Sequence, residues 1–244
     1  MLLNETLVKR FKEAYDKLNA SGKLVPKARL DEYHKTFEQN FGPEQLKQLD
    51  GVALLEKMHD HSSVNRDSLV YWLEFKDDDE LPAIFGSIAG GSALKFGIYK
   101  RKENGIWMTG SPQKQQELSL EEAVDYARKH RDQLIRGAAL LEKLPHQATD
   151  EDYRALQQQM EAEAPDVSDT AWGHKYFYML YPDKLIDYHV SHYQRFYLYK
   201  LQQVPPRGEG RYLTDGRFIT VANELGIPGK HLSVILGNLF GRPH

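Results

Sequence analysis

The spacing of apolar residues changes twice along this chain, and this change restricts the fold to a mixture of helices and a small sheet. From residue 1 to about 59 the apolar residues recur every three or four positions, the period of an amphipathic helix. Between 69 and 110 they become rich in β-branched and aromatic types, which favours strands. From 119 onward the helical spacing returns. The pattern therefore predicts an α+β fold.

Residues that start and stop helices divide the two helical regions. Asn4 can cap a first helix, and Pro43 suits the first position of a later one. Ser119 and Glu122 form a predicted capping box for a long helix that ends near Lys143. The buried stripe of this helix should comprise Ala123, Tyr126, Ala127, Leu134 and Leu141. Other helices are expected at 28–40, 43–59, 149–163, within 171–203, and at 216–225 and 229–239.

A small antiparallel sheet of three to five strands is expected around 69–110. Its strands would come from 69–75, 84–88, 93–100 and 106–109. Asn104-Gly105 is a good hairpin signal because both residues tolerate positive φ. The glycine-rich piece 86–92 lacks the lysine of a phosphate loop, although Lys95 is near, and a turn explains it better.

Three parts can be distinguished: a helical lobe at 1–68, a sheet with a long helix at 69–170, and an aromatic-rich helical part at 171–244. One compact domain remains the alternative. Residues 113–170 carry seven basic and thirteen acidic side chains, whereas 171–244 carry nine basic and five acidic ones. The basic carboxy-terminal part is compatible with a polyanionic partner, although ordinary variation also explains it.

The sequence lacks the residues that several classes of chemistry require. The chain has no cysteine, which excludes disulfides, thiolate metal sites and a cysteine nucleophile. No phosphate loop, GxSxG elbow or HExxH motif is present, so we expect no enzyme and no cofactor. His174, His189 and His192, or the acidic run 77–80, could hold a metal only if the fold gathered them. Without a signal-peptide core or a membrane span, the protein is expected to be cytoplasmic.

Aromatic side chains interleaved with cations could bind nucleic acid by stacking bases and contacting phosphates. One such cluster lies between Trp172 and Tyr199 and includes Lys175 and Arg195. Its residues also share helical faces, so packing in a core is the competing interpretation. The second cluster lies on the expected strands and could wall a pocket for an extruded base. It comprises Tyr71, Trp72, Lys95, Lys100, Arg101 and Trp107.

The last segment has the spacing of a helix-turn-helix hairpin. Ala222 precedes Gly226 by four residues, and apolar residues follow that glycine at six and nine positions. A DNA-reading hairpin would turn its second helix toward the groove. The side chains that would contact DNA are Lys230, His231, Ser233 and Asn238. Many helical hairpins with this spacing do not bind DNA.

Several short sequence segments, and the order in which they occur, resemble the amino-terminal region of McrB-like AAA+ proteins of modification-dependent restriction systems. They are Tyr71–Phe75, Phe85–Gly97, Trp172–Tyr176, Tyr181–Lys184 and Gln194–Tyr197. The resemblance spans roughly 70–240 and includes no catalytic motif. It implies a specificity module of an antiviral defence system that selects DNA, often by a base modification, for a AAA+ motor and a nuclease subunit.

The leading hypothesis is therefore a non-catalytic DNA-recognition module of a restriction AAA+ system, with a modified base as one form of its target. The first alternative is a protein-protein interaction module that docks a motor or nuclease partner through its helices. The further alternative is a metal-dependent enzyme that acts on nucleotides or nucleic acid. No membrane partner is expected.

Overall fold

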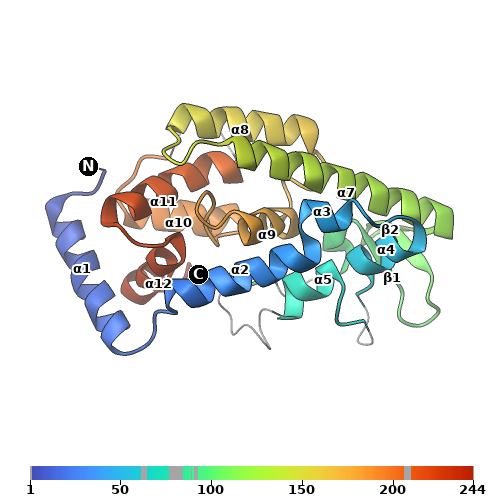
Figure 1. Ribbon diagram of the computed structural model, residues 1–244, viewed down its shortest axis with the longest axis horizontal. Coiled ribbons are helices and arrows are strands. Elements are labelled where there is room, and N and C mark those ends of the chain that lie inside the picture. Colours follow the sequence, from blue (N-terminus) through green and yellow to red (C-terminus); the bar gives the residue numbers. More distant parts are fainter. Residues whose placement is uncertain are drawn as a thin grey trace.

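The computed structural model describes residues 2–61, 65–76, 85–88, 90, 93–205 and 210–243. Helices dominate these residues, and three short strands form one antiparallel sheet in the order β1-β2-β3 (Figure 1). The predicted α+β class is therefore confirmed.

The elements follow one another in a mostly helical order. The amino-terminal half contains α1 (Glu5–Ala20), α2 (Lys27–Phe41), α3 (Pro43–Leu46), α4 (Gly51–His59), α5 (Leu69–Tyr71), a π-helical turn (Trp72–Lys76), a 3-10 turn (Ala93–Phe96), β1 (Ile98–Lys100), β2 (Trp107–Ser111) and β3 (Lys114–Leu118). The remainder contains α7 (Leu120–Lys143), α8 (Asp150–Glu163), α9 (Ala171–Leu180), α10 (Ser191–Lys200), α11 (Arg211–Leu225) and α12 (Gly229–Phe240).

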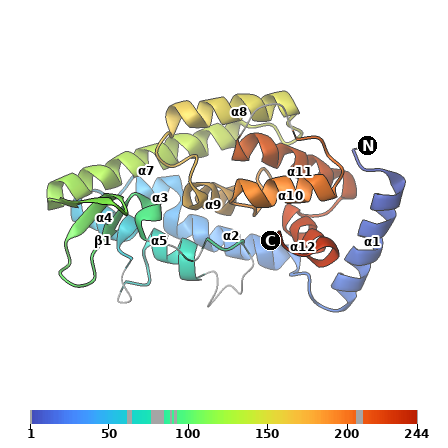
Figure 2. The ribbon, with the colours of Figure 1, turned by 180° about the vertical axis from the view of Figure 1, so that it is seen from behind.

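The molecule is elongated, with α1 at one end and the sheet at the other (Figure 1). Helices α7 and α8 run along one long side and α2 along the other, with α9 between them. Helix α8 packs against α11, α2 against α9, and α1 against α12. Seen from behind, α10 lies along α11 (Figure 2). Segments distant in sequence therefore meet around α9 and α11.

Local signals for helix ends are confirmed. The Asn4 side chain accepts a hydrogen bond from the Leu7 amide at 2.8 Å. Ser119 and Glu122 make both hydrogen bonds of a capping box, and α7 ends at Lys143. Four members of the predicted α7 stripe are buried, whereas Tyr126 is only half-buried. These interactions join residues that are only a few positions apart, so the sequence alone was sufficient to predict them.

The predicted strand over 69–75 is wrong, because this segment forms α5 and the π-helical turn. Ser68 caps it by accepting a hydrogen bond from the Tyr71 amide at 3.2 Å. Leu69, Val70 and Leu73 are all buried. A short apolar run that is buried on every side does not distinguish a strand from a helix.

The sheet lies further along the chain than expected, at 98–118. The hairpin at Asn104-Gly105 joins β1 to β2 as predicted, with Tyr99 opposite Met108. The expected strand at 93–100 begins with a 3-10 turn instead. Residues 85–88 form no strand, and 84 and the acidic run 77–80 lie outside the described residues. Strand β3 carries almost only exposed polar side chains, so no alternation of apolar and polar residues identifies it as a strand in the sequence.

The buried apolar side chains form two clusters. One extends through α2 to α9 and includes the sheet residues Ile98 and Trp107. The other joins α1 to the carboxy-terminal helices through residues such as Phe11, Phe218 and Leu232. The segment around Leu185 and Ile186 passes from one cluster to the other. Helix α1 is thus packed with the end of the chain.

Two helical glycines should respond in opposite ways to alanine. At Gly137 a Cβ would lie 2.3 Å from the Phe177 Cζ, whereas at Gly237 the nearest atom is the Tyr197 hydroxyl at 3.8 Å. Gly137→Ala should lower the free energy of unfolding by about 1–3 kcal/mol through overpacking. Gly237→Ala should raise it by about 0.5 kcal/mol, because alanine favours the helix. Urea denaturation of both variants checks this, and a Gly137→Ala protein as stable as wild type would contradict it.

Candidate functional site

An ion pair between Lys230 and Asp187 lies between two pockets in the carboxy-terminal half. Lys230, at the start of α12, places its Nζ 2.6 Å from the Asp187 Oδ2 in the loop that joins α9 to α10. Lys230 lines both pockets, whereas Asp187 lines one of them. We call them the α2–α12 pocket and the tyrosine pocket.

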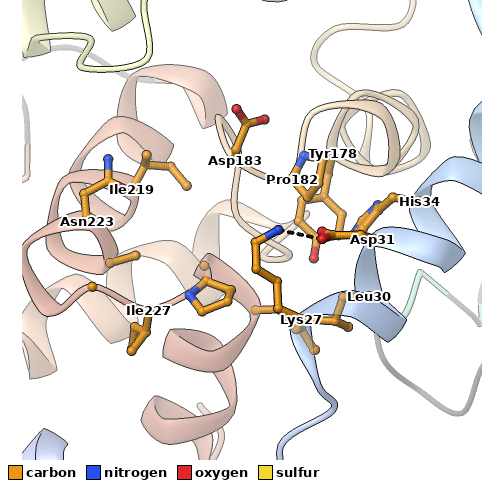
Figure 3. A pocket seen from close by; sticks show the side chains of 15 residues that line it. Lys27, Leu30, Asp31, His34, Tyr178, Pro182, Asp183, Ile219, Asn223 and Ile227 are labelled. Carbon is orange, nitrogen blue, oxygen red and sulfur yellow. Dashed lines mark hydrogen bonds and ion pairs between the residues drawn. The ribbon is translucent and has the colours of Figure 1, made fainter.

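The α2–α12 pocket has a volume of about 380 Å³ and lies between α2, the loop after α9, and the turn from α11 to α12. Figure 3 shows Lys27 reaching toward Asp31, with Ile219 and Asn223 on the α11 side and Asp183 above. Its charged lining comprises Lys27, Asp31, Asp183 and Lys230, so cations and anions balance. The lining of this pocket therefore favours neither a cationic nor an anionic ligand.

The tyrosine pocket has a volume of about 430 Å³ and lies between the loop after α9, α10 and α12. Three tyrosines contribute to its wall, and Tyr188 and Tyr197 stack with centroids 4.6 Å apart. Tyr193 is half-buried, whereas the other two are buried. The residues that line it are Gly86, Ser87, Asp187, Tyr188, His189, Val190, Tyr193, Tyr197, Lys230, Ser233, Val234, Gly237 and Arg242.

A buried polar network fixes the loop that carries Asp187. The Asp215 carboxylate on α11 meets the His174 Nε2 at 2.8 Å and accepts hydrogen bonds from the Gln194 side chain and the Ile186 amide. His174 is in turn 2.9 Å from His189. Burial raises the pKa of Asp215, whereas these partners lower it. The network therefore joins α9, α10, α11 and the loop at one point.

The protons of this network can be assigned from its acceptors. The His189 Nε2 lies 2.7 Å from the Phe85 carbonyl, so it must donate. Burial lowers the pKa of His189 far below its usual value, which keeps the ring neutral and leaves its Nδ1 as an acceptor. His174 then donates through Nδ1, and one further proton lies between its Nε2 and Asp215. His189 thus contributes no charge to the tyrosine pocket.

The residues expected on the sheet do not gather around one pocket. Lys100 and Trp107 line a pocket together, but Tyr71, Trp72 and Lys95 do not line it. Trp72 is 9% exposed and packs against Phe41 with centroids 5.2 Å apart. Trp107 is 6% exposed, and Lys100 lies over its ring at 5.6 Å. Tyr71 is half-buried beside Phe75. Both tryptophans are core residues, and Tyr71 and Trp72 belong to a helical segment rather than to strands.

Most of the expected phosphate-binding cations are already engaged. Lys175 is 1% exposed and donates to the Leu73 carbonyl at 2.8 Å. Lys95 donates to the Ile88 and Gly90 carbonyls and pairs with Glu74. Arg195 is exposed, whereas Lys100 and Arg101 are half-exposed on the β1–β2 hairpin. The candidates therefore do not converge on one surface.

The helix-turn-helix spacing predicts the turn correctly. Gly226 adopts a φ of 66°, and the Ile227 amide donates to the Ala222 carbonyl at 3.1 Å. However, α12 uses its polar side chains internally. His231 donates to the Val25 carbonyl at 2.7 Å, and the Ser233 hydroxyl donates to the Lys230 carbonyl at 2.9 Å.

Of the four side chains expected to contact DNA, only Asn238 is exposed. Helix α1 packs against α12 and covers part of it. A helix that reads a groove must present its side chains outward. The open surface beside α12 is instead the tyrosine pocket, which includes Lys230 and Ser233.

No group of three or more metal-binding side chains occurs within the described ranges. The fold does bring His174 and His189 together, but His192 is exposed and does not join them. Within the same residues, every helix is too short or too polar to span a bilayer. Comparisons of the chain with protein-family models, curated proteins and solved structures find no match.

The most informative site residue, Asp187, gave no signal in the sequence. It is one acid in an ordinary Ile-Asp-Tyr stretch, and its partner Lys230 is 43 residues away. Tyr188, Tyr193 and Tyr197 belong to the aromatic cluster that the sequence did reveal. Most of that cluster is buried, in agreement with the core-packing interpretation.

Acid should destabilise the protein before most carboxylates titrate. Burial lowers the pKa of His34 and of His130 to about 4, and those of His59 and His189 also fall. Below pH 6.5 the unfolded chain binds protons that the folded chain does not, so the free energy of unfolding decreases toward pH 4. Each of the first two histidines should contribute about 2 kcal/mol between pH 7.5 and 5.0.

The variant His34→Asn isolates one of these contributions. His34 lines the α2–α12 pocket and its Nδ1 donates to the Met179 carbonyl at 2.8 Å, a bond that the asparagine amide can replace. The pH dependence in urea denaturation should therefore weaken, whereas the matched variant His146→Asn, at an exposed position, should leave it unchanged. An unaltered pH dependence in His34→Asn would contradict the assignment.

Proposed function

We propose that this chain is a non-catalytic DNA-recognition module that holds a base or nucleotide in the tyrosine pocket. The observation that carries the proposal is the composition of that pocket: the aromatic residue Tyr193, a carboxylate from Asp187 and cations from Lys230 and Arg242. Aromatic side chains stack on bases, carboxylates accept from amino groups, and cations attract phosphates.

The size of the pocket also supports the proposal. Its 430 Å³ falls within the usual range of small-molecule sites, roughly 300–1,000 Å³, and a nucleotide fits that range. The resemblance to McrB-like specificity regions supports the same class of partner.

A second basic surface could add phosphate contacts. The β1–β2 hairpin carries Lys100, Arg101 and Lys102, of which Lys102 is exposed. These cations line a shallow pocket with Tyr99. Phosphate contacts would position a duplex, and the tyrosine pocket would supply selectivity.

Filling the tyrosine pocket should weaken DNA recognition. Gly237 on α12 lines the pocket and has room for a side chain, so Gly237→Leu should occupy it while keeping the helix. We expect about tenfold weaker binding to the preferred DNA in fluorescence anisotropy. The measurement uses duplex and single-stranded DNA, with and without modified bases, at two salt concentrations.

The matched control is Gln39→Leu, which places a leucine at an exposed position of α2 away from the pocket. It should bind like wild type, and wild-type affinity should fall steeply as salt rises. Failure to bind any DNA at low salt, or binding independent of salt, would overturn the proposed function. Equal binding by Gly237→Leu and wild type would overturn the location of the site.

A protein-interaction module is the second candidate, favoured by one apolar patch. Tyr199, near the end of α10, and Val204, four residues beyond the helix, are 77% and 79% exposed and line a shallow pocket together. Exposed apolar surface of this kind often marks a docking site. The double variant Tyr199→Ser with Val204→Ser should then lose co-purification with a motor or nuclease subunit while keeping DNA affinity. Retained co-purification would count against this candidate.

A further inference from the structure

Asp187 is a buried carboxylate with incomplete hydrogen bonding. The residue is 6% exposed, and its Oδ2 pairs with Lys230. Its Oδ1 has no hydrogen-bond partner within the part of the chain that the structure describes. A buried carboxylate oxygen without a donor is costly, and such atoms in folded proteins call for a water or a ligand. Because Asp187 lines the tyrosine pocket, a turn of its side chain toward the pocket would let a ligand there supply the donor.

The aromatic wall defines the shape of that ligand. Tyr188 and Tyr197 are held in place, since their hydroxyls donate to the Ser233 and Gly241 carbonyls. Tyr193 is less buried than either of them. A flat ring can lie against Tyr193 without moving the stacked pair. The wall therefore suits a planar group.

The charges of the pocket decide between two classes of ligand. Tyrosines beside a carboxylate also suit an alkylated ammonium group, as in aromatic cages. Here, however, Lys230 neutralises Asp187, Arg242 adds a second cation, and His189 is neutral. The lining thus carries one net positive charge, which opposes a cationic ligand and favours one with an anionic group.

We infer that the tyrosine pocket selects a planar heterocycle with an exocyclic amino group and a linked phosphate, that is, a cytosine or adenine nucleotide, and that Asp187 reads the amino group. This inference rests on the proposed function and specifies the chemistry of its ligand. The amino group donates to the Asp187 Oδ1, and Lys230 and Arg242 attract the phosphate.

The experiment compares nucleotides that differ only in the amino group. Isothermal titration calorimetry with the full chain would use CMP against zebularine 5′-monophosphate, and AMP against purine riboside 5′-monophosphate. The second member of each pair has hydrogen in place of the amino group. We expect the amino-bearing member of at least one pair to bind about tenfold more tightly, the effect of one hydrogen bond to a charged acceptor.

Asp187→Asn should reduce this preference several-fold, because an amide oxygen is a weaker acceptor than a carboxylate. The matched variant Asp183→Asn changes an exposed acid in the same loop that lines the other pocket, and it should keep the preference. If Asp187→Asn does not fold, Gly237→Leu serves instead. It leaves Asp187 in place and should abolish binding of all four nucleotides.

Equal affinity within both pairs, or no binding at millimolar concentration, would overturn the inference. Tighter binding of a trimethyllysine peptide than of CMP and AMP would also overturn it, because the charge argument would then be wrong. The proposed function fails separately. If DNA binding depends on the pocket but the nucleotides show no preference for the amino group, the proposed function stands and the inference fails. If the nucleotides show the preference but the protein does not bind DNA, the proposed function fails and the amino-group selectivity of the pocket stands.

Discussion

The Asp215 carboxylate is the group around which the carboxy-terminal half is built. It is fully buried, and a carboxylate in that position is tolerated only when donors surround it. Those donors come from three different elements: His174 on α9, Gln194 on α10 and the Ile186 amide in the loop between them. Loss of any one of these donors would leave the buried Asp215 carboxylate with incomplete hydrogen bonding. This requirement keeps α9, α10 and α11 in one arrangement.

The same network gives the site its rigidity. Ile186 is bound through its amide and His189 through both ring nitrogens, so the two residues between them, Asp187 and Tyr188, are held at each side. Gly86 also lies against this stretch, since a Cβ there would be 2.3 Å from the Asp187 carbonyl. A loop fixed in this way loses little conformational entropy when a ligand binds.

Interactions that close within a few residues were predictable from the sequence, and those that join distant segments were not. The Asn4 cap, the capping box of Ser119 and the turn at Gly226 are all local. The helical 69–75 segment depends on burial by the rest of the fold, and the pairing of Asp187 with Lys230 depends on the arrangement of α12. Even the sequence segments that resemble McrB-like regions place His174 and Lys175 in the protein interior. These two residues therefore support the fold and do not form a binding surface.

The packing of α1 against α12 affects how the chain folds during synthesis. The Leu2 amide donates to the Glu224 carboxylate, 222 residues further along, and Leu7, Phe11 and Leu18 share a cluster with Leu232 and Ile235. The apolar face of α1 therefore leaves the ribosome long before its partner helix exists. Until then it is exposed surface that can associate wrongly or engage a chaperone. This end of the molecule can therefore be completed only after α12 has been synthesised.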